Sequence, residues 1–269
     1  MCSMSNYITT QTFGVKSLLA RINDETLRLI DVRRKEEYDV DHITNAVNLP
    51  LAKLLEDDKP ENVAKIAGEL GISDDTSVVI YDDTFGALSS RVVWALQYIG
   101  HKDVSLLEVT FSQWKQLGHD TSIKTPSINT AKHSVNLQQE MLATADYLEK
   151  AKEKKNVVLI DNRERLNFLE RHIPGAINIP YKSLGTDGKI LRTKDSMRNF
   201  LKNRGINDDA EVITYCGSVG TFSGLAYYAL KSAGIPNVKL YVRSFKEWRS
   251  LEKPVGKQED AAYWDLSAE

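Results

Sequence analysis

The chain contains the same sequence unit twice. The segment LIDVRRKEEYDVDHITNAVNLP, residues 29–50, aligns without a gap with LIDNRERLNFLERHIPGAINIP, residues 159–180, at an offset of 130. The segment GISDDTSVVIYD, residues 71–82, aligns with GINDDAEVITYC, residues 205–216, at an offset of 134. Each copy takes about half of the 269 residues, which is long enough to bury a core of its own. The repeat therefore predicts a duplicated fold.

Both copies alternate short apolar runs with helix-like segments. Strands that alternate with helices predict an α/β fold, in which each copy forms a mostly parallel sheet flanked by helices. Ligands of such sheets bind at the carboxyl ends of the strands. The expected strands are residues 27–30, 78–81 and 104–107 in the first copy and 157–160, 212–215 and 238–242 in the second, with amphipathic helices at 89–99 and 223–233.

The stretch between the copies is polar and has no apolar periodicity. Such a composition is typical of a linker. We therefore predict an N-terminal domain at residues 1–118, a linker at residues 119–134 and a C-terminal domain at residues 135–269.

Charge and cysteine content exclude several classes of protein. The 35 basic and 37 acidic residues are mixed along the chain, so we expect neither a nucleic-acid partner nor a membrane partner. The start of the chain lacks the apolar segment of a signal peptide, which favours a cytoplasmic protein. The two cysteines, Cys2 and Cys216, fit a reducing compartment without a disulfide framework.

The two copies differ at the residue that ends the second strand, where Cys216 in the second copy aligns with Asp82 in the first. The loop after Cys216 contains Gly217 and Gly220, whose backbone freedom allows N–H groups to turn inward and form an anion-binding nest. The helix that follows directs its N-terminus at the same place. Both effects stabilise a thiolate, so Cys216 is the candidate nucleophile; the alternative is a small buried apolar residue.

Other polar residues near this loop have two interpretations each. Ser218 and Thr221 either donate hydrogen bonds to a bound oxyanion or to the sulfur, or cap the next helix. The loop has no basic residue, so Arg163, beyond the end of another strand, is the candidate donor of positive charge. Its alternative is a structural ion pair with Asp161 or Glu164.

The histidines do not indicate a metal site. His42 and His172 recur at the same place in both copies, although only one copy has the cysteine, so we expect packed, hydrogen-bonded roles for them. No histidine pairs with a cysteine at metal-ligand spacing. We predict that the protein uses no metal and no cofactor.

Three motifs resemble those of the rhodanese superfamily, specifically its two-domain sulfurtransferases. DVRRKEEYDVDHI at residues 31–43 is similar to the first family signature, HIPGAINIP at 172–180 repeats part of it, and FKEWRSLEKPV at 245–255 is similar to the C-terminal signature. The resemblance extends over nearly the whole chain. It implies two tandem rhodanese-like domains, of which the first, with Asp82, is catalytically inert.

The resemblance also implies a chemistry for the second domain. Cys216 would take the sulfane sulfur of a small anionic donor, hold it as a persulfide, and pass it to a thiol or to cyanide, with a protein thiol as one such acceptor. The loop residues that the resemblance assigns to substrate binding are Gly217, Ser218, Val219, Gly220 and Thr221, with Arg163 outside the loop.

The absence of basic residues from the loop bears on which sulfur donor the protein uses. The loop resembles the 3-mercaptopyruvate branch more than the thiosulfate branch, whose loops usually carry basic residues, so 3-mercaptopyruvate is favoured over thiosulfate. The chain departs from the family at two places. Val219 and Gly220 stand in the reverse of the usual order, and Asn167 replaces a substrate-binding arginine, for which Arg165 is the alternative.

Two other functions compete with the enzyme. A persulfide carrier would receive sulfur from a partner protein and relay it without an efficient small-molecule donor. A cysteine phosphatase of related fold is disfavoured, since it needs an arginine after the nucleophile, and residues 217–225 contain no basic residue.

Overall fold

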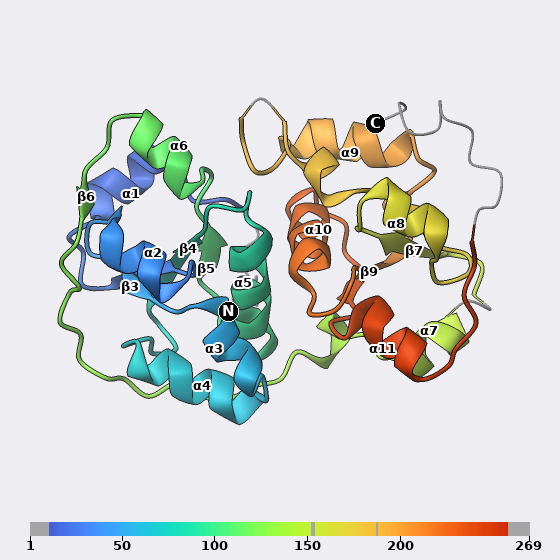
Figure 1. Cartoon of the computed structure of the whole chain (residues 1–269), viewed down its shortest axis with the longest axis horizontal. Helices are drawn as coiled ribbons and strands as arrows, with labels where there is room; N and C mark the ends of the chain where they lie inside the picture. Colours follow the sequence, from blue (N-terminus) through green and yellow to red (C-terminus); the bar gives the residue numbers. More distant parts are fainter. Residues whose placement is uncertain (1–10, 152–153, 187, 258–269) are drawn as a thin grey trace, which may run out of the picture. The chain divides into compact units, whose positions relative to one another are not determined.

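The computed structural model describes residues 11–151, 154–186 and 188–257. The chain divides into two compact units, Met1–Gln139 and Glu140–Glu269, drawn from blue to green and from yellow to red in Figure 1. Each unit holds its own four-stranded parallel sheet, as the repeat predicts. Among the described residues, no helix combines the length and the apolar character needed to cross a membrane.

The first unit has the strand order β3-β1-β4-β5, and all neighbouring strands are parallel. The central strands are rich in buried aliphatic side chains because helices cover both of their faces. Their bounds are Val47–Asn48 for β3, Leu27–Asp31 for β1, Ser77–Tyr81 for β4 and Val104–Leu106 for β5.

Helices close both faces of this sheet. Leu18 of α1 and Trp114 of α6 belong to one buried cluster with Leu29 and Val79 of the sheet, whereas α5 packs on β4 and β5 and against α3 and α4. The helices are α1 (Val15–Arg21), α2 (Lys35–Val40), α3 (Leu51–Glu56), α4 (Pro60–Glu69), α5 (Ala87–Tyr98) and α6 (Phe111–Gln116); a short ribbon pairs β2 (His42–Ile43) with β6 (Thr121–Ser122).

The second unit repeats this arrangement with the strand order β10-β9-β7-β8. Leu148 of α7 and Trp248 of α11 pack on one face of its sheet, and α10 packs on β9 and β10. The short helix η1 (Gln139–Met141) spans the boundary between the two units in the sequence. The elements of the second unit are α7 (Ala145–Ala151), β7 (Val157–Asp161), α8 (Arg165–Glu170), β8 (Ile177–Asn178), η2 (Tyr181–Leu184), α9 (Lys194–Lys202), β9 (Glu211–Tyr215), α10 (Thr221–Ser232), β10 (Val238–Leu240) and α11 (Ser244–Ser250).

The predicted α/β class and parallel sheets are confirmed, but two helices begin earlier in the sequence than predicted. The helices after β4 and β9 start at Ala87 and Thr221, two residues earlier than predicted, because Gly86 and Gly220 take left-handed backbone angles and begin the helix directly. Residue 223 therefore lies inside the first turn of α10.

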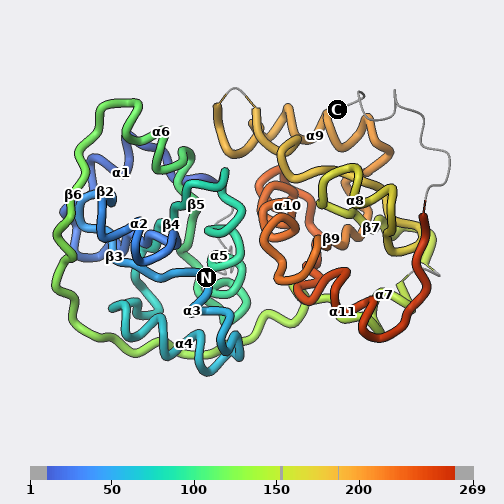
Figure 2. The backbone as a smooth tube through the Cα atoms, viewed as in Figure 1, coloured from blue at the N-terminus to red at the C-terminus, as the bar shows by residue number. Residues whose placement is uncertain are grey.

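Residues 119–134, the predicted linker, make specific contacts with the first unit. Figure 2 follows this stretch of backbone along the outside of that unit. Thr121–Ser122 pairs with β2, and the N–H of Ala131 donates to the carbonyl of Gly68 at 2.9 Å. Near the end of the stretch, His133 Nε2 lies 3.0 Å from Nδ1 of the buried His101. The stretch is thus anchored by backbone pairing and by an imidazole pair.

The imidazole pair predicts a pH dependence of stability. Burial is the main cause that holds the pKa of His101 below its usual value, and the adjacent His133 is the second. Hydrogen bonds to Thr76 and Asp103 oppose this shift. An acidic side chain, Asp74, lies 3.7 Å from His133. The folded state disfavours protonated His101. The contribution of this residue to the unfolding free energy is therefore fully present above about pH 6.5, where the imidazole is neutral, and is lost as the pH falls through that value.

We therefore expect the urea unfolding free energy to fall between about pH 8 and about pH 5.5 by more in the wild type than in His101→Gln. The difference between the two pH profiles is the measured quantity, since groups remote from His101, His133 and Asp74 titrate equally in both proteins. Identical profiles would contradict this assignment.

Candidate active site

Cys216 lies directly after β9, a central strand of the second sheet, at its carboxyl end. The residue is only 2% exposed and its thiol is free. Its N–H donates to Ser244 Oγ at 3.1 Å, its carbonyl accepts from the N–H of Phe245 at 3.1 Å, and Ser244 Oγ lies 3.8 Å from the sulfur. The start of α11 therefore fixes the backbone that carries the thiol.

The loop between Cys216 and α10 has the backbone geometry expected of a nest. Gly220 has φ 77° and ψ 23°, and Gly86, at the same place in the first copy, has φ 81° and ψ 2°. A side chain would be strained at these angles, which explains the glycine in both copies. The left-handed residue turns the chain so that the first-turn N–H groups of the helix face the end of the strand.

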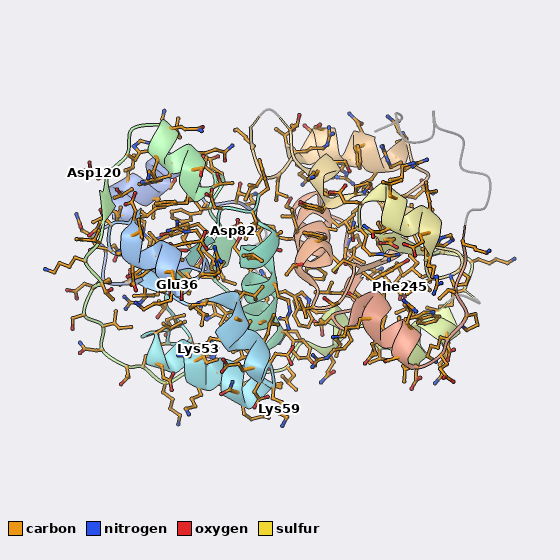
Figure 3. The ribbon with its side chains drawn as sticks, viewed as in Figure 1. Glu36, Lys53, Lys59, Asp82, Asp120 and Phe245 are labelled. Atoms are coloured by element: carbon orange, nitrogen blue, oxygen red, sulfur yellow. The ribbon has the colours of Figure 1, made fainter. Side chains whose placement is uncertain are left out.

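The first copy shows what such a loop binds. One carboxylate oxygen of Asp82, Oδ1, accepts hydrogen bonds from the N–H groups of Thr84 and Gly86 at 2.8 and 2.9 Å. The other, Oδ2, accepts from the N–H groups of Leu88 and Ser89, both at 2.8 Å, and from Ser89 Oγ at 3.1 Å. Figure 3 labels Asp82 where β4 gives way to α5. The loop is an anion cradle with five donors, occupied by its own aspartate.

The second copy has the same frame around Cys216. The offset of 134 places Cys216 at the position of Asp82, and the loop is followed by the same left-handed glycine and helix. The residues at the places of the four that donate to Asp82 are Ser218, Gly220, Phe222 and Ser223. An anion attached to Cβ of residue 216 would therefore face an equivalent set of donors.

Arg163 is held by its neighbours. Its Nε and Nη2 donate to the two carboxylate oxygens of Asp161 at 3.0 and 2.6 Å, Nη2 also donates to the carbonyl of Arg171, and the guanidinium lies 4.1 Å from the ring centroid of Phe245. Burial opposes the charge, but the hydrogen bonds and charge of Asp161 outweigh it and raise the pKa of Arg163. The ion pair with Asp161, the structural alternative, is therefore present.

A pocket of about 650 Å³ opens beside the loop. Its lining comes from the loop, from the strand end with Arg163, and from α8, α10 and α11. The lining residues are Arg163, Glu164, Asn167, Gly217, Phe222, Phe245, Lys246, Arg249 and Ser250. Lys246 and Arg249 add positive charge that the sequence interpretation did not include.

Both of these cations are exposed, and neither forms an ion pair with any residue in the described ranges. The first copy shows why Arg249 is unpaired. Lys115, at the place of Arg249, pairs with Asp41 at 2.8 Å, whereas Arg171 occupies the place of Asp41 in the second copy. The repeat alignment could have revealed this difference, since it shows an acid replaced by a base.

The predicted site residues lie in the loop that begins at Cys216 or, like Arg163, in the lining of the pocket beside it. Arg163 and Gly217 line the pocket, Cys216 and Gly220 are buried, Ser218 and Val219 are partly exposed in the loop, and Thr221 starts α10. Asn167 lines the pocket, whereas Arg165 is outside the described lining.

Other predicted residues are placed as follows. His42 is stacked on Tyr38 and His172 on Phe168, and Nδ1 of each histidine donates to the backbone carbonyl of that aromatic residue, so the packed, hydrogen-bonded roles expected of them are confirmed. The described ranges contain no group of three metal-ligating side chains that could hold a metal ion. Cys2 lies outside the described residues.

Comparisons with known proteins match this architecture. The family model for the rhodanese-like domain matches residues 14–117 and again 144–251. The chain is 27% identical to a thiosulfate sulfurtransferase of Azotobacter vinelandii over 86% of this chain and 91% of that protein. It is 28% identical to the sulfur carrier protein TtuD of Thermus thermophilus, over 83% and 88%.

A solved structure with the rhodanese fold aligns with this chain over most of its length. The crystal structure of SseA from Escherichia coli, described as a 3-mercaptopyruvate sulfotransferase with the rhodanese fold, aligns with a TM-score of 0.79 at 26% identity. The alignment covers 88% of this chain and 99% of that one.

Proposed function

This chain belongs to the rhodanese-like family of sulfurtransferases, and from that premise we propose that Cys216 carries a sulfane sulfur as a persulfide. The observation that supports the proposal most is the cradle. The same loop binds a carboxylate in the first copy, and the second copy places a thiol where that carboxylate begins. A cradle for an anion, with a nucleophile at its base, suits an intermediate that is negatively charged.

The first half-reaction loads the cysteine. With 3-mercaptopyruvate, the Cys216 thiolate attacks the donor sulfur, an S–S bond forms and the C–S bond breaks. The electron pair of that bond goes to carbon, which takes up the thiol proton, and pyruvate leaves. With thiosulfate, the bond between the two sulfurs breaks and sulfite leaves with the electron pair. Both routes end with the Cys216 persulfide anion.

The second half-reaction returns the thiolate. The acceptor attacks the outer sulfur, and the S–S bond to Cys216 breaks with its electron pair on the cysteine. Cyanide becomes thiocyanate, and a thiol becomes a persulfide. A thiol acceptor on a protein fits the same scheme.

The positions of the cations favour 3-mercaptopyruvate as donor. Lys246 and Arg249 lie on α11, among the lining residues, and not in the loop that follows Cys216. The carboxylate of 3-mercaptopyruvate is separated from its sulfur by two carbon atoms, so it can reach such cations while the sulfur lies at Cys216. The sulfonate of thiosulfate is bonded directly to the sulfane sulfur and would need positive charge within the loop. Arg163 completes the proposed substrate site with loop residues 217–221.

We expect the double variant Lys246→Ala/Arg249→Ala to raise KM for 3-mercaptopyruvate by about tenfold with a smaller change in kcat, because the lost charges bind the donor before and during the reaction. Steady-state kinetics with cyanide as acceptor measure both constants. The matched control is Lys239→Ala, a lysine of the same unit that donates to the carbonyl of Glu140. An unchanged KM in the double variant would show that these two cations do not bind the donor.

A persulfide carrier is the second candidate, favoured by the similarity to the sulfur carrier protein TtuD. A screen of 3-mercaptopyruvate and thiosulfate, recording turnover and persulfide formation together, separates the two functions. Turnover with either donor supports the enzyme. Loading of Cys216 from a persulfidated protein, without turnover of either small donor, supports the carrier.

A further inference from the structure

Ser223 carries a buried hydroxyl group close in sequence to Cys216. It lies in the first turn of α10 and is 0% exposed. Its Oγ has no hydrogen-bond partner among the described residues. Buried polar groups are almost always hydrogen-bonded, so an orphaned hydroxyl beside a proposed active site indicates a partner that arrives during function.

The equivalent serine of the first copy indicates which group such a hydroxyl can contact. Ser89, at the place of Ser223, is also buried, and its Oγ donates to Asp82 Oδ2 at 3.1 Å. The N–H of Ser89 donates to the same oxygen at 2.8 Å. In the second copy, the group that would accept both bonds must extend from Cys216, which replaces Asp82.

The number of bonds from Cβ distinguishes the empty thiolate from the loaded persulfide. The carboxylate oxygens of Asp82 are two bonds from Cβ, whereas the sulfur of a thiolate is one bond from Cβ. The outer sulfur of a persulfide is again two bonds away, at an S–S length of about 2.05 Å. The carboxylate of Asp82 therefore stands in for the loaded cysteine and not for the empty one.

We propose that the hydroxyl of Ser223 donates a hydrogen bond to the outer sulfur of the Cys216 persulfide and is unpaired until that sulfur arrives. This inference rests on the proposed function, since it assigns a donor to the proposed intermediate. Ser223 is then a catalytic residue that stabilises the persulfide anion relative to the thiolate. With 3-mercaptopyruvate, the outer sulfur becomes anionic when the thiol proton passes to carbon, and the hydrogen bond from Ser223 then stabilises that charge.

The test compares the loaded and the empty states. The protein is equilibrated with mixtures of thiosulfate and sulfite, and intact mass gives the ratio of persulfide to thiol at each mixture. The rate of alkylation by iodoacetamide reports on the empty thiolate. The unfolding free energy reports on any structural role.

We expect Ser223→Ala to lower the persulfide-to-thiol ratio by about tenfold or more, as for the loss of a hydrogen bond to a charged group. The alkylation rate should change by less than about twofold, and the unfolding free energy should not decrease, because the hydroxyl has no partner in the empty state. Ser223→Thr keeps the hydroxyl and should retain the ratio. The matched control Ser89→Ala should lose stability, since it breaks the bond to Asp82, with the ratio unchanged.

Two results overturn the inference while the proposed function stands. One is a wild-type ratio in Ser223→Ala, and the other is an alkylation rate that falls as much as the ratio, which would place the hydroxyl on the thiolate. If the wild type forms no persulfide with thiosulfate, with 3-mercaptopyruvate or with a persulfidated protein, the proposed function fails and this inference fails with it.

Discussion

We expect Cys216→Ser to abolish sulfur transfer from 3-mercaptopyruvate and thiosulfate, with kcat lowered by about a thousandfold or more. A serine hydroxyl is not ionised near neutral pH and is a weak nucleophile toward sulfur, so neither half-reaction can proceed. Formation of thiocyanate from cyanide measures the loss with both donors.

The fold should survive this substitution, which separates chemistry from stability. The backbone groups of Cys216, and not its thiol, make the short hydrogen bonds to Ser244 and Phe245. The circular dichroism spectrum and the urea midpoint of Cys216→Ser should therefore match those of the wild type. Turnover within about tenfold of the wild type would show that another group carries the sulfur.

We expect Asp82→Ala to lower the unfolding free energy of the first unit by about 3 kcal/mol or more. The substitution leaves the buried N–H groups of Gly86 and Ser89, together with the other donors of the cradle, without their acceptor. Urea unfolding followed by hydrogen exchange of α5 measures the effect within that unit, since the two units need not unfold as one.

The matched substitution in the second copy is Cys216→Ala. Within residues 11–151, 154–186 and 188–257, the thiol has a weak hydrogen-bond contact with Ser244 Oγ at 3.8 Å, so we expect a loss of about 1 kcal/mol or less. The same position would thus be structural in one copy and dispensable for stability in the other. Equal losses in the two variants would contradict the description of Asp82 as the occupant of the cradle.

The occupied cradle also supports the proposal that the first domain is catalytically inert. Asp82 fills the place in which a persulfide would lie, and its neighbour Asp83 holds Ser112, where the second copy has Gly217 and Lys246. The first copy has neither the nucleophile nor the cation next to it.

The fold could be predicted from the sequence because its determinants are local and are repeated. Apolar runs of strand length alternate with helical segments, and the gapless alignment of residues 29–50 with 159–180 gives the duplication. The sequence does not predict strands β3 and β8, since each has two residues and too short a pattern to distinguish from a loop.

The site could be predicted only where chemistry and backbone are adjacent in the sequence. Cys216 and its glycine loop form one continuous motif. Lys246 and Arg249 are some 30 residues away, and only the packing of α11 beside the loop brings them to the pocket. The sequence predicts only that Ser223 begins an amphipathic helix, since the missing partner of its hydroxyl is visible only in the folded chain.

The intact mass of the donor-treated protein tests the central claim most directly. After incubation with 3-mercaptopyruvate or thiosulfate and removal of the excess, the wild type should gain one sulfur atom, and peptide mapping should place it on Cys216. Cys2→Ser should keep this adduct and Cys216→Ser should lose it, while cyanide should remove it from the wild type. An adduct that persists unchanged in Cys216→Ser would contradict the account.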